Sequence, residues 1–170
     1  MSEKFVVGLI VANHFGVLNR IAGLYSKRGY NIDSVAVGET EDPDFSRMTI
    51  VSTGDSYMKD QVIKQLNKLY DVQKVVLLDD HKAVSVEHLL IKIKTSNKGN
   101  CKLTALITSY GGKVVDFGEG YVIADITGNN DQINKFIDEC LDFGVLEVCR
   151  SGLISLSRGT ENLLGSHTKK

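Results

Sequence analysis

The feature that most constrains the fold of this chain is an order of predicted elements that occurs twice along its 170 residues. The first half is predicted to begin with a strand at 4–12, a helix from Val17 and a hairpin with strands at 30–39 and 46–54. A second helix after Ser56 and a strand at 72–78 complete it. The second half repeats the order at 87–94, 101–110, 113–118 with 121–127, 130–143 and 145–157. A βαββαβ order lays two helices on one face of a four-stranded antiparallel sheet. The sequence therefore predicts an α+β protein with two tandem ferredoxin-like βαββαβ domains.

Identical or similar residues at a constant offset of 83 also favour a duplication: Ser26 with Ser109, Gly29 with Gly112, Ile32 with Val115, Asp33 with Asp116, and Gly16 with Gly99. We expect a first domain at 1–80, a linker at 81–86, a second domain at 87–159 and a polar tail at 160–170. Because the first strand is apolar on both faces, its sheet needs cover from the other repeat or from a second chain.

Composition narrows the classes of partner. The 20 basic and 21 acidic side chains nearly cancel and are scattered, which disfavours nucleic acid and anionic membranes as partners. No apolar run reaches the roughly 18 residues of a spanning helix, and the first residues lack the pattern of an export signal, so we expect a cytoplasmic protein. Three separated cysteines, Cys101, Cys140 and Cys149, predict buried thiols and neither disulfides nor a zinc site.

Motifs for catalysis are missing from the sequence: it contains no glycine-rich phosphate loop, no His-Glu-x-x-His, no nucleophile elbow and no Cys-x-x-Cys. The four histidines are far apart, which disfavours a metal site.

The segment from Asn13 to Leu18 carries the strongest indication of ligand binding, because a predicted strand ends there and a helix begins. Backbone N–H groups at a helix start, with the helix dipole, favour a carboxylate by about 0.3–1 kcal/mol. Gly16 permits close approach to the backbone, while Asn13 suits either a helix cap or a ligand contact. Asn31, predicted to open the next strand, offers a donor and an acceptor to a zwitterion. The alternative is a cap, a tight turn and a turn amide, so the pattern by itself indicates a ligand-binding or interaction module.

A longer stretch identifies a family. The segment 13–21, running into 26–32, resembles the opening of acetohydroxyacid synthase (acetolactate synthase) small subunits, and segments 46–50, 150–152 and 156–159 are also similar to that family. The resemblance implies an N-terminal ACT domain, which is a ferredoxin-like domain that commonly senses amino acids, and a second domain of related fold. It also implies a homodimer whose ACT sheets join edge to edge, with effector sites at the subunit interface.

The resemblance also implies which residues bind the effector: Asn13, Phe15, Gly16, Val17 and Leu18 of one chain, with Asn31 and Ile32 of its neighbour. Valine is the expected effector. Leucine and isoleucine remain alternatives, because one methylene changes the binding free energy by only about 1–3 kcal/mol. At the offset of 83, Ser96 stands opposite Asn13 and Val114 opposite Asn31. The second repeat therefore lacks both amides, and we expect one site in the first repeat.

The function implied by the resemblance is that of a non-catalytic regulatory subunit in branched-chain amino acid biosynthesis. It would activate a separate catalytic subunit and mediate feedback inhibition by valine. Thiamine diphosphate, Mg²⁺ and FAD would belong to that partner, and no cofactor to this chain. Two alternatives are an amino-acid-sensing ACT protein that regulates another partner or transcription, and a small enzyme on a ferredoxin-like fold. The first is disfavoured because no helix-turn-helix segment or basic surface is evident.

Overall fold

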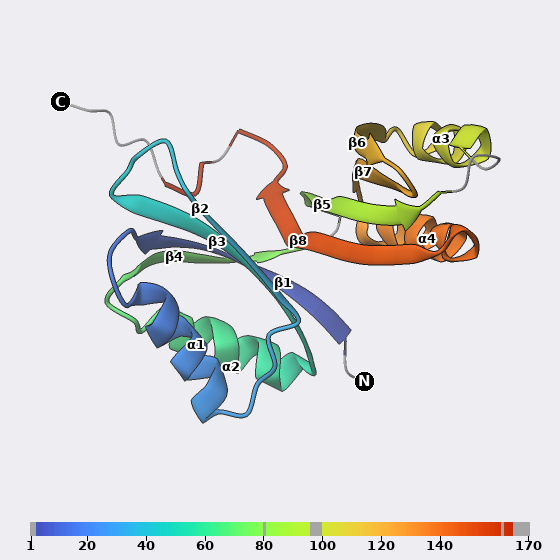
Figure 1. Ribbon diagram of the computed structural model, residues 1–170. Coiled ribbons are helices and arrows are strands. Elements are labelled where there is room, and N and C mark those ends of the chain that lie inside the picture. Colours follow the sequence, from blue (N-terminus) through green and yellow to red (C-terminus); the bar gives the residue numbers. More distant parts are fainter. Residues whose placement is uncertain (1–2, 80, 96–99, 161, 165–170) are drawn as a thin grey trace. The chain divides into compact units, whose positions relative to one another are not determined.

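The computed structural model describes residues 3–79, 81–95, 100–160 and 162–164 (Figure 1). The chain divides into two compact units, one of Met1–Ser85 with Leu153–Lys170 and one of Val86–Gly152.

The first unit confirms the predicted βαββαβ order. Its elements are β1 (Glu3–Ala12), α1 (Val17–Lys27), β2 (Ser34–Glu39), β3 (Phe45–Gly54), α2 (Ser56–Leu66) and β4 (Val72–Leu78). The strands form an antiparallel sheet in the order β2-β3-β1-β4, and α1 and α2 cover one face of it (Figure 1). The edge strands of this sheet are therefore β2 and β4.

The central strand β1 is buried on both faces, as its sequence predicts. On the helix side, Val7 lies opposite Ile50 and Leu9 opposite Met48, and all four belong to the core that α1 and α2 cover. On the other face Val6 belongs to a second cluster of buried residues, with Val51, Leu78 and Ala83 and with Leu153 packed against it. Part of the expected cover is therefore supplied by the start of β5 and the end of β8.

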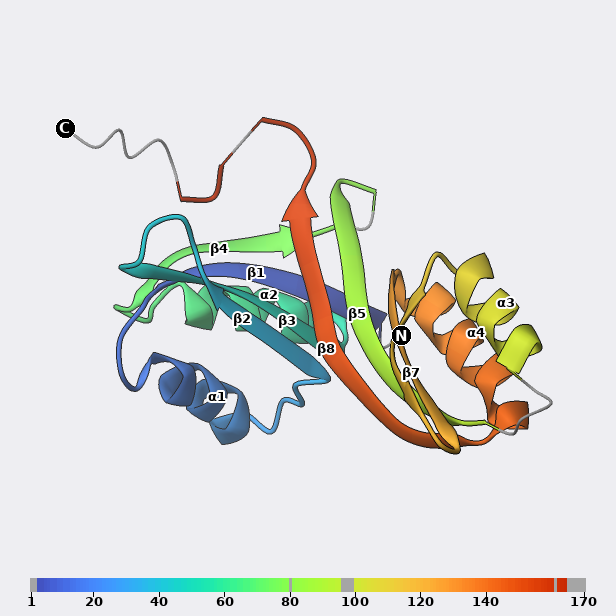
Figure 2. The same cartoon turned by 45° about the horizontal axis from the view of Figure 1, so that its top comes forward.

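The second unit repeats the order. Its elements are β5 (Ala83–Lys94), α3 (Asn100–Ser109), β6 (Lys113–Gly118), β7 (Tyr121–Gly128), α4 (Asn130–Cys140), a short 3-10 helix (Leu141–Phe143) and β8 (Val145–Ser157). The sheet order is β6-β7-β5-β8. Helices α3 and α4 lie on one side of this sheet (Figure 2). They share one core with β5 and β7. Because β5 begins at Ala83, most of the expected linker at 81–86 lies in a strand.

The predicted start of the second strand at Tyr30 is wrong because of the way α1 ends. The Gly29 N–H donates to the Ser26 carbonyl at 3.1 Å and the Tyr30 N–H to the Tyr25 carbonyl at 3.0 Å, with Gly29 at φ 65°. This arrangement closes the helix with a glycine in the left-handed region. Because the Tyr30 amide bonds to the helix, β2 begins at Ser34 and not at Tyr30.

The same closure after α3 shows that the repeat offset is 82 at this point and not 83. There the Gly111 N–H donates to the Thr108 carbonyl and the Gly112 N–H to the Ile107 carbonyl, both at 2.9 Å. Gly111, at φ 72°, is thus the counterpart of Gly29 (111 − 29 = 82). Counterparts of Asn13 and Asn31 at this offset are Thr95 and Lys113, neither of them an amide. Ser96 and Gly99, used in the sequence comparison, lie outside the described residues.

The expectation that all three cysteines are buried is wrong for Cys101 and Cys149, which are exposed; Cys140 is fully buried, and all three are free. Burial raises the pKa of the Cys140 thiol to about 12 from its ordinary 9.0, and the nearby Glu139 carboxylate adds to the rise. A raised folded-state pKa gives stability that is complete below pH 9 and is lost as the pH climbs toward 12.

We therefore expect the free energy of unfolding to fall between pH 8 and pH 10.5 by about 1–2 kcal/mol more in wild type than in Cys140→Ala. The measurement is urea unfolding followed by circular dichroism, since the chain has no tryptophan. Cys149→Ala, which removes an exposed thiol, should keep the wild-type dependence. Equal pH dependence in the Cys140 and Cys149 variants would contradict the prediction.

Candidate functional site

The turn between β1 and α1 begins the helix on a glycine. Gly16 is the N-cap, at φ 89°, and no side chain caps the helix. Its carbonyl accepts the first helical hydrogen bond, from the Arg20 N–H at 3.0 Å. The amides of residues 17–19 precede that donor, and the first turn contains no acidic side chain. The helix start is therefore suited to a carboxylate.

Asn13 does not cap the helix, which excludes one of the two roles that its position allows. Its side-chain Nδ2 donates to Glu39 Oε1 at 3.1 Å and to the Pro43 carbonyl at 2.9 Å, and its backbone N–H donates to the Asp44 carbonyl at 2.7 Å. Both amide protons of the side chain are thus directed at acceptors of the first unit. The carbonyl oxygen on the other edge of the amide is an acceptor, which suits an ammonium group and not a carboxylate.

Asn31 is held in a similar way, in the segment between α1 and β2. Its Nδ2 donates to Asp33 Oδ1 at 2.8 Å, and the Thr53 hydroxyl donates to Asp33 Oδ2 at 2.6 Å. The amide therefore also presents its oxygen as the remaining acceptor. Ile32 packs against the core, which leaves its backbone for any ligand contact.

The predicted site residues fall into two groups that one chain does not bring together. Asn13, Phe15, Gly16, Val17 and Leu18 form a continuous turn before and into α1, whereas Asn31 and Ile32 follow its other end. The 11 residues of α1 span about 16 Å. One amino acid cannot contact both groups of the same chain, so a site that uses both needs two chains.

Side-chain exposure divides the apolar members of the turn. Phe15 is 99% exposed and Leu18 51%, whereas Val17 is 4% exposed and belongs to the core. Val17 therefore offers only its amide, while Phe15 and Leu18 form an uncovered apolar surface beside the helix start.

The sequence pattern does not reveal a group of three polar residues, Asp71, Arg20 and His14, that lies behind this turn. Asp71, which is 4% exposed, makes an ion pair with Arg20 Nη1, and its Oδ1 lies 3.1 Å from His14 Nε2. The Asp71 carbonyl also accepts the Ala12 N–H at 2.8 Å. Nothing in the spacing of the sequence connects Asp71 with residues more than 50 positions earlier, so only the folded chain reveals this group.

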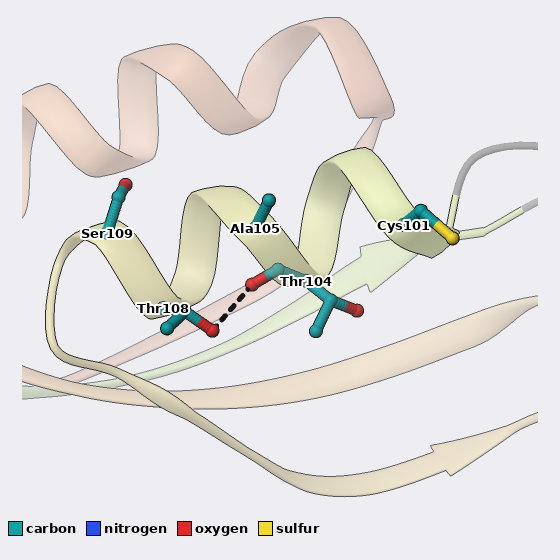
Figure 3. Close-up of a pocket in the computed structure, with 5 residues that line it drawn as sticks. All are labelled: Cys101, Thr104, Ala105, Thr108 and Ser109. Atoms are coloured by element: carbon teal, nitrogen blue, oxygen red, sulfur yellow. Dashed lines mark hydrogen bonds between the residues drawn. The ribbon is translucent and has the colours of Figure 1, made fainter.

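An open depression lies elsewhere, on the exposed face of α3 (Figure 3). It is lined by Cys101, Thr104, Ala105, Thr108 and Ser109. The Thr108 hydroxyl donates to the Thr104 carbonyl at 2.9 Å, within the helix itself. The lining contains no charged side chain that could recognise an amino acid.

Two structural findings hold for the described part of the chain. No group of three or more His, Cys, Asp or Glu side chains there is arranged to hold a metal ion. None of its helices has the length and apolar character needed to cross a membrane.

Comparison with known families gives matches over both repeats. Residues 7–74 match the family model described as AHAS small subunit-like ACT domain, and residues 86–159 match the model described as small subunit of acetolactate synthase.

Individual relatives agree with these models over nearly the whole chain. The acetolactate synthase small subunit of Haemophilus influenzae is 37% identical, over 94% of this chain and 98% of its own length. The acetolactate synthase isozyme 3 small subunit of Escherichia coli is 36% identical, over 91% and 95%. The crystal structure of the acetolactate synthase small subunit of Thermotoga maritima has a TM-score of 0.85 and 32% identity, covering 94% of this chain and 99% of that one.

Proposed function

This chain belongs to the acetolactate synthase small-subunit family, and from that premise we propose that it is a non-catalytic regulatory subunit whose ACT domain binds valine between two copies of the chain. As a small subunit it works with a catalytic large subunit. Thiamine diphosphate, Mg²⁺ and FAD would act in that partner.

The observation that carries the proposal is the start of α1. Gly16 leaves the first-turn amides without a side-chain cap, and the left-handed glycine brings a ligand close to the backbone. These amides, with the positive end of the helix dipole, would bind the carboxylate of the amino acid. Phe15 and Leu18 supply an apolar surface for a small branched side chain.

The two asparagines would bind the other end of the zwitterion. Because both direct their NH₂ groups at protein acceptors, their carbonyl oxygens are the atoms suited to the ammonium. Asn13 comes from the chain that provides the helix start, and Asn31 would come from the neighbouring chain.

The edge strand β2 supports a dimer in which two sheets join. Val35 lies opposite Ile50 and Val37 opposite Met48, so both valines face the helix side of the sheet. They are nevertheless 40% and 53% exposed. A second β2 pairing with this edge would satisfy its free ladder positions and cover apolar surface. The dimer would also bring the Asn31 of one chain toward the turn of the other.

Regulation would follow from coupling between this interface and the catalytic subunit. Valine that binds one arrangement of the two ACT domains more tightly than another shifts their equilibrium, with a typical coupling of about 1–3 kcal/mol. The subunit would activate its partner in the unliganded arrangement, and valine would weaken that activation.

Replacing Gly16 with Asp tests the site, with Gly16→Asn as the matched control. Both side chains meet the same backbone cost at φ 89°, and only Asp places a charge beside the ligand carboxylate. Two like charges about 4 Å apart repel by about 1–4 kcal/mol in a partly solvated site. We expect valine to bind the Asp variant at least about tenfold more weakly than the Asn variant. Isothermal calorimetry measures this, with circular dichroism to show that both variants are folded.

Two outcomes would contradict the proposal. One is equal affinity of the Asp and Asn variants for valine, which would place the ligand elsewhere. The other is no heat with valine, leucine or isoleucine at millimolar concentration in wild type, which would remove the sensing role and leave a subunit insensitive to these amino acids.

A further inference from the structure

Asp71 holds both ends of the turn that begins α1. Its backbone carbonyl accepts the Ala12 N–H before the turn, and its carboxylate pairs with Arg20 after it. The second carboxylate oxygen lies 3.1 Å from His14 Nε2 within the turn. The Asp71 side chain is 5% exposed, so Arg20, rather than water, balances its charge.

Arg20 reaches from this buried carboxylate to the glycine at the helix start. Its Nη1 bonds to Asp71, and a Cβ placed on Gly16 would lie 3.9 Å from its Nη2. The guanidinium is a planar fork with five N–H donors, so one nitrogen can bind Asp71 while the other stays directed at Gly16. The side chain is 54% exposed, so a ligand can reach it from solvent.

We propose that Arg20 binds the carboxylate of the amino-acid effector, beside the first-turn amides, and that Asp71 is the positioning residue that fixes the Arg20 guanidinium over Gly16. This inference rests on the proposed function, because it names further members of the same site. It adds a full positive charge to a site whose other donors are neutral amides.

Electrostatics favour this arrangement over amides alone. A charge-assisted hydrogen bond is about twice as strong as a neutral one, and a guanidinium matches the geometry of a carboxylate. Without Asp71, a half-exposed arginine would populate many rotamers, and ordering it would cost part of the binding energy. Since the Arg20 guanidinium pairs with Asp71, the buried negative charge is screened from the incoming carboxylate.

A purely structural role for Arg20 makes a different prediction, which a change of ligand detects. L-Valinamide has the side chain and ammonium of L-valine but no carboxylate. If Arg20 contacts the carboxylate, its removal weakens valine binding far more than valinamide binding. If Arg20 only holds the turn in place, both ligands weaken together.

The experiment measures the affinities of L-valine and L-valinamide by calorimetry for full-length wild type, Arg20→Gln, Asp71→Asn and the double variant. The preference is the ratio of the affinity for L-valine to the affinity for L-valinamide. We expect this ratio to be lower by roughly tenfold or more in Arg20→Gln than in wild type. Asp71→Asn should lower it in the same direction, and the double variant should lose little more than Arg20→Gln. Arg28→Gln removes an exposed arginine just after the other end of α1 and should keep the wild-type preference.

The outcomes separate this inference from the proposed function. Wild type that fails to bind valine would overturn both. Wild type that binds valine, with an unchanged preference in a folded Arg20→Gln variant, would overturn the role of Arg20 alone. If Asp71→Asn does not fold, the comparison of wild type with Arg20→Gln still shows whether Arg20 contacts the ligand carboxylate, because this variant changes a half-exposed residue.

Discussion

Replacing Arg150 with Met is expected to lower the free energy of unfolding of the second unit by about 3 kcal/mol, because it leaves a buried carboxylate without its counter-charge. Glu87 is 5% exposed, and Arg150 binds it through Nε at 2.8 Å and Nη2 at 2.5 Å. The same guanidinium donates to Asn134 and Asn130 of α4, both at 3.0 Å. One side chain of β8 thus joins β5 to α4. Methionine is similar in length, so the loss is mainly electrostatic.

Amide hydrogen exchange by mass spectrometry locates this effect, because it reports opening of each unit separately. Protection should fall in the second unit and stay unchanged in β1 and β3. Arg158→Met, which removes an exposed arginine, should have no effect. The double variant Glu87→Leu/Arg150→Met should recover most of the loss, since an apolar pair can replace a buried ion pair. Wild-type protection in Arg150→Met would show that water already solvates Glu87.

A heterodimer of a Gly16→Asp chain and an Asn31→Ala chain is expected to bind valine, although neither parent homodimer does. In a Gly16→Asp homodimer both helix starts repel the carboxylate, and in an Asn31→Ala homodimer both sites lack the neighbour's amide. In the mixed dimer one site carries both changes. The other combines an intact helix start with an intact Asn31, so one wild-type site returns.

This expectation follows from the length of α1. Within one chain the turn at Gly16 and the amide of Asn31 are separated by a helix of 11 residues. A site contained in one chain would need only one of these groups, and mixing would then restore nothing beyond the average of the two parents.

How much of the fold the sequence predicts depends on how local the signals are. The bounds of β4 and β8 agree with the prediction because turns and alternating apolar residues mark both ends. The predicted start of β2 is too early because the hydrogen bond from the Tyr30 N–H to the Tyr25 carbonyl depends on how the helix closes. By residue type alone, Gly112 matches Gly29. The structural counterpart of Gly29 is Gly111, because Gly111 has the same left-handed backbone conformation.

In the candidate site, too, the sequence indicates the residues that form a local pattern and does not indicate those that depend on distant contacts. The sequence indicated the turn at Gly16 because a glycine between a strand and a helix is a local pattern. It could not assign the partners of Asn13, since Glu39 and Pro43 are brought to it by the hairpin of β2 and β3. Asp71 escaped notice because its role depends on burial and on contacts with a distant segment.

The most direct test of a valine site shared by two chains is a calorimetric titration of the purified heterodimer of Gly16→Asp and Asn31→Ala chains, isolated with two different affinity tags. The account predicts one valine bound per heterodimer, with an affinity close to that of wild type, and no measurable binding to either parent homodimer at the same concentrations. A heterodimer that is folded and dimeric but binds no valine would contradict it.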